Sequence, residues 1–385
     1  MRKRTAYFKD RLLSKKWLVI LIVGVILTVF GRVIDNKALT QSGIVVGIGI
    51  DYRDNLYDVT IQAVAVDGGA GSDKGSTNFL TYSAKGKTIS DAVNSLSEKL
   101  GLIVSLSHCN LVIMTRSALA LEPVRTFSAL TKPLALPEQA LVVATDMDIG
   151  KVFASKIPST ENVSFFLQSV LLQNLGAGGL TSVSVKDYLA MRCSRSGGVM
   201  VPYLELYEMT DKPISSQPSE DKNYVIDLNK NLVINDKGDM VIDETTAKSA
   251  NMFLSKDVKD KIAVPLKNGG VVEFRVIKVS SKTKVEGMKV VCEMKMNVSF
   301  VEAQGFDTPL VLNCNSPEVL DAKNTLEQML ADNLKDCFKL SQDSGIDFLG
   351  LENLLYQKHG RHLPQNCFDQ ILFEASYSVT VTENS

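Results

Sequence analysis

The sequence has few of the residues that most catalytic and metal sites require. It contains three histidines in 385 residues, and none of its six cysteines forms a CxxC pair. This excludes a zinc ribbon and a thioredoxin-like redox motif, because both need paired cysteines at that spacing. The GxSxG and HExxH motifs of serine hydrolases and zinc proteases are also missing. These absences leave little support for catalysis.

The six cysteines are spread widely along the chain. Their even number would permit disulfides outside the cytoplasm, but a chain of 385 residues can bury a sizeable core without them. We therefore favour buried free thiols, with disulfides as the alternative. The six positions are Cys109, Cys193, Cys292, Cys314, Cys337 and Cys367.

The chain has little net charge, and that charge is unevenly distributed. The formal net charge is −1 at pH 7. Residues 1–16 hold seven basic side chains and one acidic side chain, so the remainder of the chain is mildly acidic. A mildly acidic body argues against a nucleic-acid partner, because neutralising phosphates requires a basic face.

One long apolar run stands near the N-terminus. Trp17 to Gly31 is a stretch of 15 uncharged residues between Lys16 and Arg32. As a helix it would be about 22 Å long, and the flanking basic side chains can reach the head groups to cover the rest of a roughly 30 Å hydrocarbon core. The basic flank predicts a cytoplasmic segment 1–16, a membrane-spanning signal-anchor 17–34 and a body outside the cytoplasm.

A cleaved signal peptide is the alternative to this anchor. Cleavage requires small residues shortly after the apolar run, and the segment from Phe30 to Asp35 lacks such a site. No cysteine follows the run where lipid attachment would need one. We therefore favour an uncleaved anchor.

Two glycine-containing motifs resemble nucleotide sites but are incomplete. Gly86-Lys87-Thr88 looks like the end of a phosphate-binding loop, but Thr81 stands where that loop needs a glycine. We expect a turn into a capped helix there instead. Gly47-Ile48-Gly49 has no third glycine and continues as a strand, so it is not a dinucleotide fingerprint.

The three histidines provide no evident metal site or catalytic pair. His359 and His362 lack a third ligand at a defined spacing. His108 precedes Cys109, but neighbours in a strand point to opposite faces, so the two side chains are not expected to meet. We predict no catalytic, cofactor-binding or metal-binding residues, no cofactor, and hence no enzyme.

Hydrophobic periodicity predicts strands and helices in no repeating order. Alternating or short apolar runs indicate strands, and apolar residues at helical spacing indicate helices. The predicted strands are about 43–51, 57–65, 111–114, 140–144, 199–207, 224–228, 232–234, 271–279, 289–302 and 371–381. The predicted helices are about 89–100, 118–130, 149–155, 162–175, 185–192, 316–343 and 347–358, with another capped by Asp243.

These elements predict an α+β fold. An N-terminal transmembrane helix is followed by an ectodomain of two to three domains, with mostly antiparallel mixed sheets and packed helices. The polar segment 210–222 contains two prolines and is the best candidate for a linker. It separates an N-terminal ectodomain region at 35–209, expected to hold two subdomains, from a C-terminal α+β domain at 223–385.

Several short segments resemble those of a known protein family. Each is weak evidence alone, but their order along the chain is more specific. In the first half they are Asp35 to Leu39, Val45 to Asp51, Lys85 to Ile89, Ser107-His108 and Leu111 to Met114. In the second half they are Lys237 to Val241, Phe300 to Glu302, Gln342, Asp347-Phe348, Gly350 and the alternating final strand. Together they resemble the Ger(x)C family, the C subunit of bacterial spore nutrient-germinant receptors.

The resemblance implies a three-domain α+β ectodomain with no known catalytic activity. It implies a location on the outer face of the spore inner membrane, in contact with membrane lipid and with two multi-pass membrane subunits of the A and B types. The family is typically lipid-anchored through a cysteine. This chain has no such cysteine, so we expect the apolar helix itself to be the anchor.

The resemblance also singles out four positions: His108, Gln342, Asp347 and Gly350. We expect structural roles for them, with Asp347 as a helix cap, Gly350 for close packing and His108 as a satisfied core group.

We therefore predict a non-catalytic extracytoplasmic subunit of a spore germinant receptor, which supports assembly or the coupling of nutrient sensing to germination. One alternative is a cell-envelope scaffold unrelated to germination. Another is a membrane-anchored hydrolase that uses His108 or a pair of carboxylates.

Overall fold

The structure is a computed structural model. It describes residues 22–23, 42–64, 79–121, 123–155, 162–173, 179–208, 224–255, 258, 260–267, 269–305, 314–364 and 367–382. The predicted linker 210–222 lies outside these residues, and so does the predicted anchor 17–34 apart from two positions. Within the described ranges, no helix is both long enough and apolar enough to cross a membrane.

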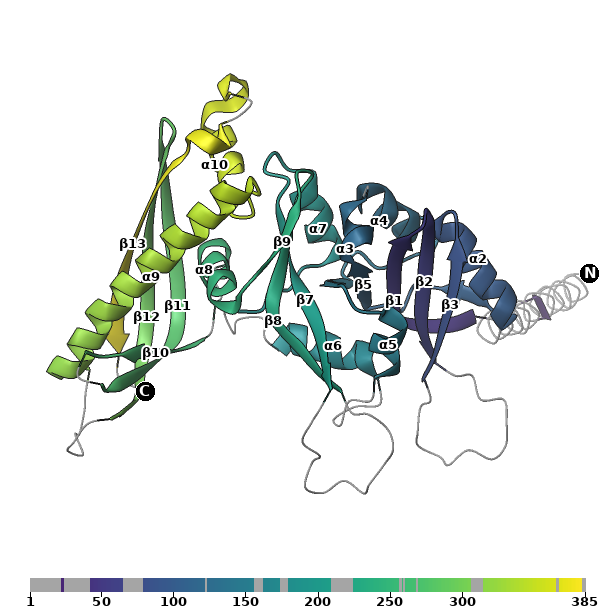
Figure 1. Cartoon of the computed structure of the whole chain (residues 1–385), viewed down its shortest axis with the longest axis horizontal. Coiled ribbons are helices and arrows are strands. Elements are labelled where there is room, and N and C mark those ends of the chain that lie inside the picture. Colours follow the sequence, from purple (N-terminus) through teal and green to yellow (C-terminus); the bar gives the residue numbers. More distant parts are fainter. Residues whose placement is uncertain are drawn as a thin grey trace, which may run out of the picture.

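The first unit is built on a nine-stranded sheet (Figure 1). Its strands are β1 Ser42–Arg53, β2 Leu56–Val64, β3 Phe79–Gly86, β4 Ile103–Ser105, β5 Leu111–Thr115, β6 Leu141–Thr145, β7 Val199–Glu208, β8 Tyr224–Ile234 and β9 Asp239–Ile242. The order is β3-β2-β1-β5-β6-β7-β8-β9, and β4 pairs with the start of β1. The four central strands β1, β5, β6 and β7 are parallel, whereas the outer strands on both sides are antiparallel.

The parallel centre corrects part of the predicted fold class. An α+β fold with mixed sheets and packed helices is confirmed, but the expectation of mostly antiparallel sheets missed these four strands. The physical reason lies in β5 and β6, in which every residue is buried. A strand that is covered by helices on both faces loses the polar alternation that marks an antiparallel, half-exposed strand.

Helices cover both faces of this sheet (Figure 1). One face carries α2 Ile89–Leu100, α3 Arg116–Ala120, α4 Pro123–Thr131 and α7 Val185–Arg192. The other face carries α5 Ile149–Ala154 and α6 Val163–Gln173. The single helix predicted at 118–130 is in fact α3 followed by α4, because Pro123 cannot continue a helix and instead begins a new one.

The glycines of the Gly47-Ile48-Gly49 motif allow helices to approach β1 closely. A Cβ atom added at Gly47 would collide with the side chain of Ser164 on α6, and one added at Gly49 would collide with Ile149 on α5. The motif therefore serves packing between the sheet and its helices.

Replacing Gly49 with alanine should lower the free energy of unfolding by about 1–3 kcal/mol, because the new methyl group overpacks a site where the buried Ile149 side chain has little room to move. Gly43→Ala on the same strand is the matched control, since its nearest neighbours would lie at 3.8 and 4.0 Å. Denaturant titration of both variants checks this, and equal losses of stability would contradict it.

The second unit places a long helix on a four-stranded sheet (Figure 1). Its strands are β10 Lys261–Pro265, β11 Val271–Glu286, β12 Lys289–Gln304 and β13 Leu372–Thr382, in the order β10-β11-β12-β13. Its helices are α8 Glu244–Leu254, α9 Pro317–Ser344 and α10 Leu351–His359, with short 3-10 turns η1 Gly360–His362 and η2 Phe368–Gln370. The alternation predicted for β12 is confirmed, because its apolar residues at even positions from 290 to 298 are buried.

One buried hydrophobic cluster spans the boundary between the two units. Although β8 and β9 follow the predicted linker along the chain, they complete the sheet of the first unit. Met200 on β7, Val233 on β8 and Ile242 on β9 pack in the same buried cluster as α8, α9 and the second sheet. The contact between the units therefore contains buried apolar side chains. Buried polar groups, among them Ser196 and Asp347, also belong to it.

Candidate functional site

Gln342, one of the four positions marked by the resemblance, connects the end of α9 to the start of β13. Its side-chain amide donates to the carbonyl oxygens of Phe368, Asp369 and Ile371, at 3.2, 3.3 and 3.3 Å. The two N–H groups of this amide are thus shared among three backbone acceptors of the turn that leads into the last strand.

Asp347 and Gly350 shape the turn between α9 and α10. The Asp347 carboxylate accepts the backbone N–H of Leu351 at 2.9 Å and that of Glu352 at 2.7 Å, so it caps α10 from within the protein. Gly350 has φ of +72°, a conformation that favours glycine. Burial raises the pKa of the Asp347 carboxyl group, although the two N–H donors act in the opposite direction.

This turn lies directly against the first unit. Residues 194–198 and residues 345–353 face one another, and we call this contact the junction. Gly197 and Asp347 form a parallel β-bridge, and the Asn235 side-chain amide donates to the carbonyl oxygen of Gly345 at 2.9 Å. At Gly198 an added Cβ atom would lie 2.5 Å from the Asp347 carbonyl oxygen. Only a glycine at position 198 allows the backbone of the first unit to lie this close to the backbone at Asp347.

Asn353 adds a second polar connection across the junction. Its side-chain oxygen accepts the backbone N–H of Ser196 at 3.2 Å, and its amide donates to the hydroxyl of Ser194 at 3.2 Å. Arg195 lies over the Tyr356 ring and donates to the carbonyl oxygen of Pro364 at 3.1 Å. These contacts join parts of the chain more than 150 residues apart.

A cavity of about 330 Å³ opens beside the junction. The buried Arg192 side chain in its wall pairs with Asp236 at 2.5 Å and donates to the carbonyl oxygen of Gly197 at 2.8 Å. Lys237 and Glu352 add charge of both signs. Among the charged groups described here, Arg192 and Glu352 form hydrogen bonds with other protein groups. Such contacts favour a role in holding the two units together over a role in proton transfer.

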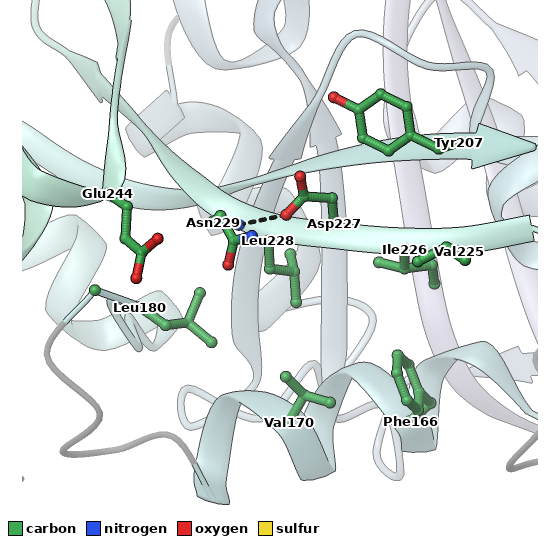
Figure 2. Close-up of a pocket in the computed structure, with 11 residues that line it drawn as sticks. Phe166, Val170, Leu180, Tyr207, Val225, Ile226, Asp227, Leu228, Asn229 and Glu244 are labelled. Atoms are coloured by element: carbon green, nitrogen blue, oxygen red, sulfur yellow. Dashed lines mark hydrogen bonds between the residues drawn. The ribbon is translucent and has the colours of Figure 1, made fainter. Parts of the chain in front are cut away.

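A larger cavity of about 510 Å³ lies between α6 and the β7–β8 hairpin (Figure 2). Phe166 and Val170 point up from α6 toward the strand above them. The acidic groups at this cavity are Asp227, whose carboxylate accepts the backbone N–H of Asn229 at 2.8 Å, and Glu244. The described lining offers an apolar floor without a nucleophile paired to a base.

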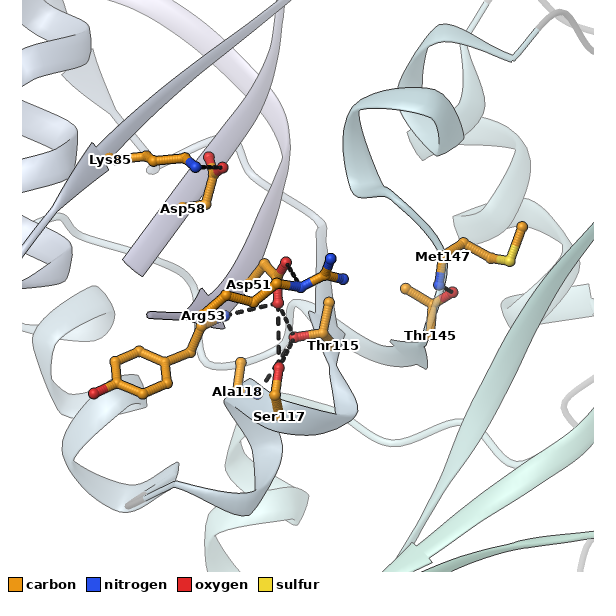
Figure 3. A network of polar contacts seen from close by, with 10 residues as sticks. Asp51, Arg53, Asp58, Lys85, Thr115, Ser117, Ala118, Thr145 and Met147 are labelled. Atoms are coloured by element: carbon orange, nitrogen blue, oxygen red, sulfur yellow. Dashed lines mark hydrogen bonds and ion pairs between the residues drawn. The ribbon is translucent and has the colours of Figure 1, made fainter. Parts of the chain in front are cut away.

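A polar network connects the carboxyl ends of the parallel strands β1 and β5 (Figure 3). Asp51 at the end of β1 accepts the hydroxyl of Thr115 at 2.7 Å, the hydroxyl of Ser117 at 3.2 Å and the backbone N–H of Tyr52 at 2.8 Å. Its other oxygen pairs with Arg53 at 2.8 Å. Sequence reasoning placed Asp51 in a family segment but missed this network, which only the parallel pairing of β1 with β5 creates.

His108 is not the core group that we predicted. It is exposed because β4 ends at Ser105 and a turn follows at residues 107–108, whereas Cys109 is buried. Burial raises the pKa of the Cys109 thiol to about 12, so it would stay protonated near neutral pH. Four of the six cysteines are buried free thiols, namely Cys109, Cys292, Cys337 and Cys367.

The remaining motif residues have local roles. Thr88 caps α2 by accepting the backbone N–H of Asp91 at 3.1 Å, and the Asp91 carboxylate accepts that of Lys87 at 3.0 Å, which confirms the capped helix. The His359 ring lies 3.0 Å from the carbonyl oxygen of Gly287. In the part of the chain that the structure describes, no group of three or more His, Cys, Asp or Glu side chains could hold a metal ion.

Comparison with known proteins identifies the family. The family model described as "Spore germination protein N-terminal domain" matches residues 35–206, and the model described as "Spore germination B3/ GerAC like, C-terminal" matches residues 231–384. A solved structure, "Crystal Structure of the GerBC protein", is 12% identical with a TM-score of 0.48, over 86% of this chain and 96% of that chain. No curated protein matches the chain. Because the two family models together cover most of the sequence, the chain belongs to the Ger(x)C, or GerAC-like, family of spore germination proteins.

Proposed function

We propose that the chain is a non-catalytic subunit of a spore germinant receptor, which supports receptor assembly or the coupling of nutrient sensing to germination. The observation that carries this proposal is the match of two spore germination family models, one to each half of the body. The sites described above support it further. Their polar groups hold strands, helices and the two units together, and a docking module requires that kind of rigidity.

The proposed location is the outer face of the spore inner membrane, with a single membrane pass and the N-terminus in the cytoplasm. The apolar run within 17–34 and the basic segment 1–16 support this topology. An anchor of this kind confines the body to the membrane surface and so raises its effective concentration near membrane partners. The proposed domains are an N-terminal ectodomain region at 35–209 and a C-terminal α+β domain at 223–385, joined by 210–222. The first strands of the C-terminal domain, β8 and β9, pair into the sheet of the N-terminal region.

The proposed partners are the multi-pass A- and B-type subunits of the receptor, together with membrane lipid. A body whose two units are joined through a buried apolar cluster can dock as a single piece, so that movement of a partner is transmitted across it. A flexible linker between independent domains would transmit much less.

Affinity purification of the tagged chain from detergent-solubilised spore inner membranes tests this function. We expect multi-pass receptor subunits among the proteins recovered, as identified by mass spectrometry. Recovery of the chain alone, or its absence from spores, would favour the cell-envelope scaffold instead.

Deleting residues 1–34 should move the chain from the membrane fraction to the soluble fraction and reduce recovery of the partner subunits at least tenfold. The expected cause is loss of the apolar anchor and of the effective concentration that it supplies. Sedimentation followed by immunoblotting measures the distribution. If the shortened chain stayed in the membrane fraction, the apolar run would not be the anchor.

A further inference from the structure

The first residues of β1 and the short strand β4 expose two branched apolar side chains. The strands pair in parallel, with Ser42 opposite Ile103 and Ile44 opposite Ser105. Along β4, Val104 points into the core, so Ile103 points away from it and is 66% exposed. On β1, Ile44 likewise points outward and is 40% exposed. Because side chains in register share a face of the sheet, the two isoleucines lie on the same outward surface.

Polar groups border these two isoleucines. The Ser105 hydroxyl, on the same outward face, lies 3.0 Å from the hydroxyl of Ser107 in the turn that follows, and His108 is exposed in that turn. We call the surface formed by Ile44, Ile103, Ser105 and Ser107 the anchor-proximal face. Branched aliphatic groups bordered by hydroxyls form an amphipathic surface, the kind that lies at the boundary between lipid head groups and acyl chains.

The length of chain between the predicted anchor and this face restricts where the face can lie. The anchor ends at Ile34 and β1 begins at Ser42, so seven residues separate them. Even fully extended, this segment spans at most about 30 Å. The start of β1 is therefore held close to the bilayer surface.

We propose that the anchor-proximal face rests on the lipid surface, with Ile44 and Ile103 in the head-group region. The inference depends on the proposed function for its anchor, and it adds the orientation of the body. Figure 1 shows α2, the helix that leads into β4, at the end of the molecule opposite to β10–β13. The second unit is thereby kept away from the bilayer, where it is available to other proteins.

Lipid-borne fluorescence quenchers can test this orientation in the full chain, reconstituted into vesicles of phosphatidylcholine and phosphatidylglycerol. The sequence contains one tryptophan, Trp17, so Trp17→Phe provides a background for single reporters. The reporter variants are Ile103→Trp and, independently, Ile44→Trp. Leu172→Trp on α6 is the matched control, because Leu172 is 47% exposed but lies on another element.

We expect a nitroxide placed near the lipid head group to quench the Ile103→Trp and Ile44→Trp reporters at least twofold more than the Leu172→Trp control. Equal quenching of reporters and control would overturn the proposal. Reporters that are shielded from aqueous iodide but not quenched by the lipid would also overturn it, because a second copy of the chain would then cover the face.

The unmodified chain separates this inference from the proposed anchor. Quenching of Trp17 by a nitroxide high on the acyl chain, the depth expected for the first residue of the predicted span, shows that the run is inserted. A negative result at Ile103 would then reject the orientation alone. Absence of Trp17 quenching would reject the anchor and the orientation together.

Discussion

Replacing Gly198 with alanine is expected to lower the free energy of unfolding by about 3 kcal/mol, a larger loss than at Gly49. The added Cβ atom would lie 2.5 and 2.6 Å from the carbonyl oxygen and carbon of Asp347, and 2.8 Å from the backbone nitrogen of Phe348. Side chains can rotate away from a new methyl group, but these are backbone atoms of a tightly hydrogen-bonded turn. The two units must therefore separate locally, which breaks the bridge between Gly197 and Asp347.

Denaturant titration of the detergent-solubilised full chain measures this loss. Gly238→Ala is the control, because no atom lies within 4 Å of a Cβ atom added there and its backbone conformation is not restricted to glycine. A Gly198→Ala variant as stable as the control would show that the junction can open without cost. A stability loss accompanied by a lower m-value would show that the two units had begun to unfold separately.

The Gly198→Ala variant at the junction can also test whether the contact between the two units matters for the proposed function. If partner movement is transmitted through the body, we expect spores carrying Gly198→Ala to germinate more slowly than spores carrying Gly49→Ala at equal receptor abundance. Both changes weaken packing, but only the first lies between the two units. Equal germination rates would argue that the body supports assembly rather than coupling.

Local chemistry made several elements predictable from the sequence. Thr88 and Asp243 cap helices as expected, because a side-chain oxygen at that position satisfies a backbone N–H that the helix leaves free. Gly345 ends α9 in the left-handed conformation that favours glycine. The strict alternation of β12 reflects one buried face and one exposed face. In each case the signal lies within a few residues of the feature.

Features formed by distant segments were not predictable in the same way. The strands β4 and β10 have only three and five residues, and β3 buries only two of its eight. Their strand structure therefore depends on neighbours that the sequence does not reveal. The junction pairs residues 194–198 with residues 345–353, and no local pattern marks either segment as a partner of the other. His108, one of the positions that the resemblance singled out, was predicted to be a core group, but it lies exposed in the turn at 107–108.

Replacing Asp347 with alanine should lower the free energy of unfolding by about 2–3 kcal/mol. The change leaves the backbone N–H groups of Leu351 and Glu352 without their acceptors in a buried turn, and each lost partner costs about 1 kcal/mol or more. Asp347→Asn retains one acceptor oxygen and should lose roughly half as much. Denaturant titration of both variants measures the difference, and an alanine variant as stable as the asparagine variant would contradict the capping role.

The pH dependence of stability, compared between the wild type and Asp347→Asn, tests whether the buried carboxyl group of Asp347 resists ionisation. Burial raises the pKa of Asp347 in the folded protein, so the folded state holds its proton more tightly than the unfolded state does. This stabilising contribution is complete below the ordinary carboxyl pKa and is lost as pH rises through the raised pKa of the folded state. Asparagine does not titrate, so the stability of the wild type relative to Asp347→Asn should fall from pH 4 upward and then level off. A relative stability that rose with pH would mean that the N–H groups of α10 outweigh burial, and that the turn favours the charged carboxylate.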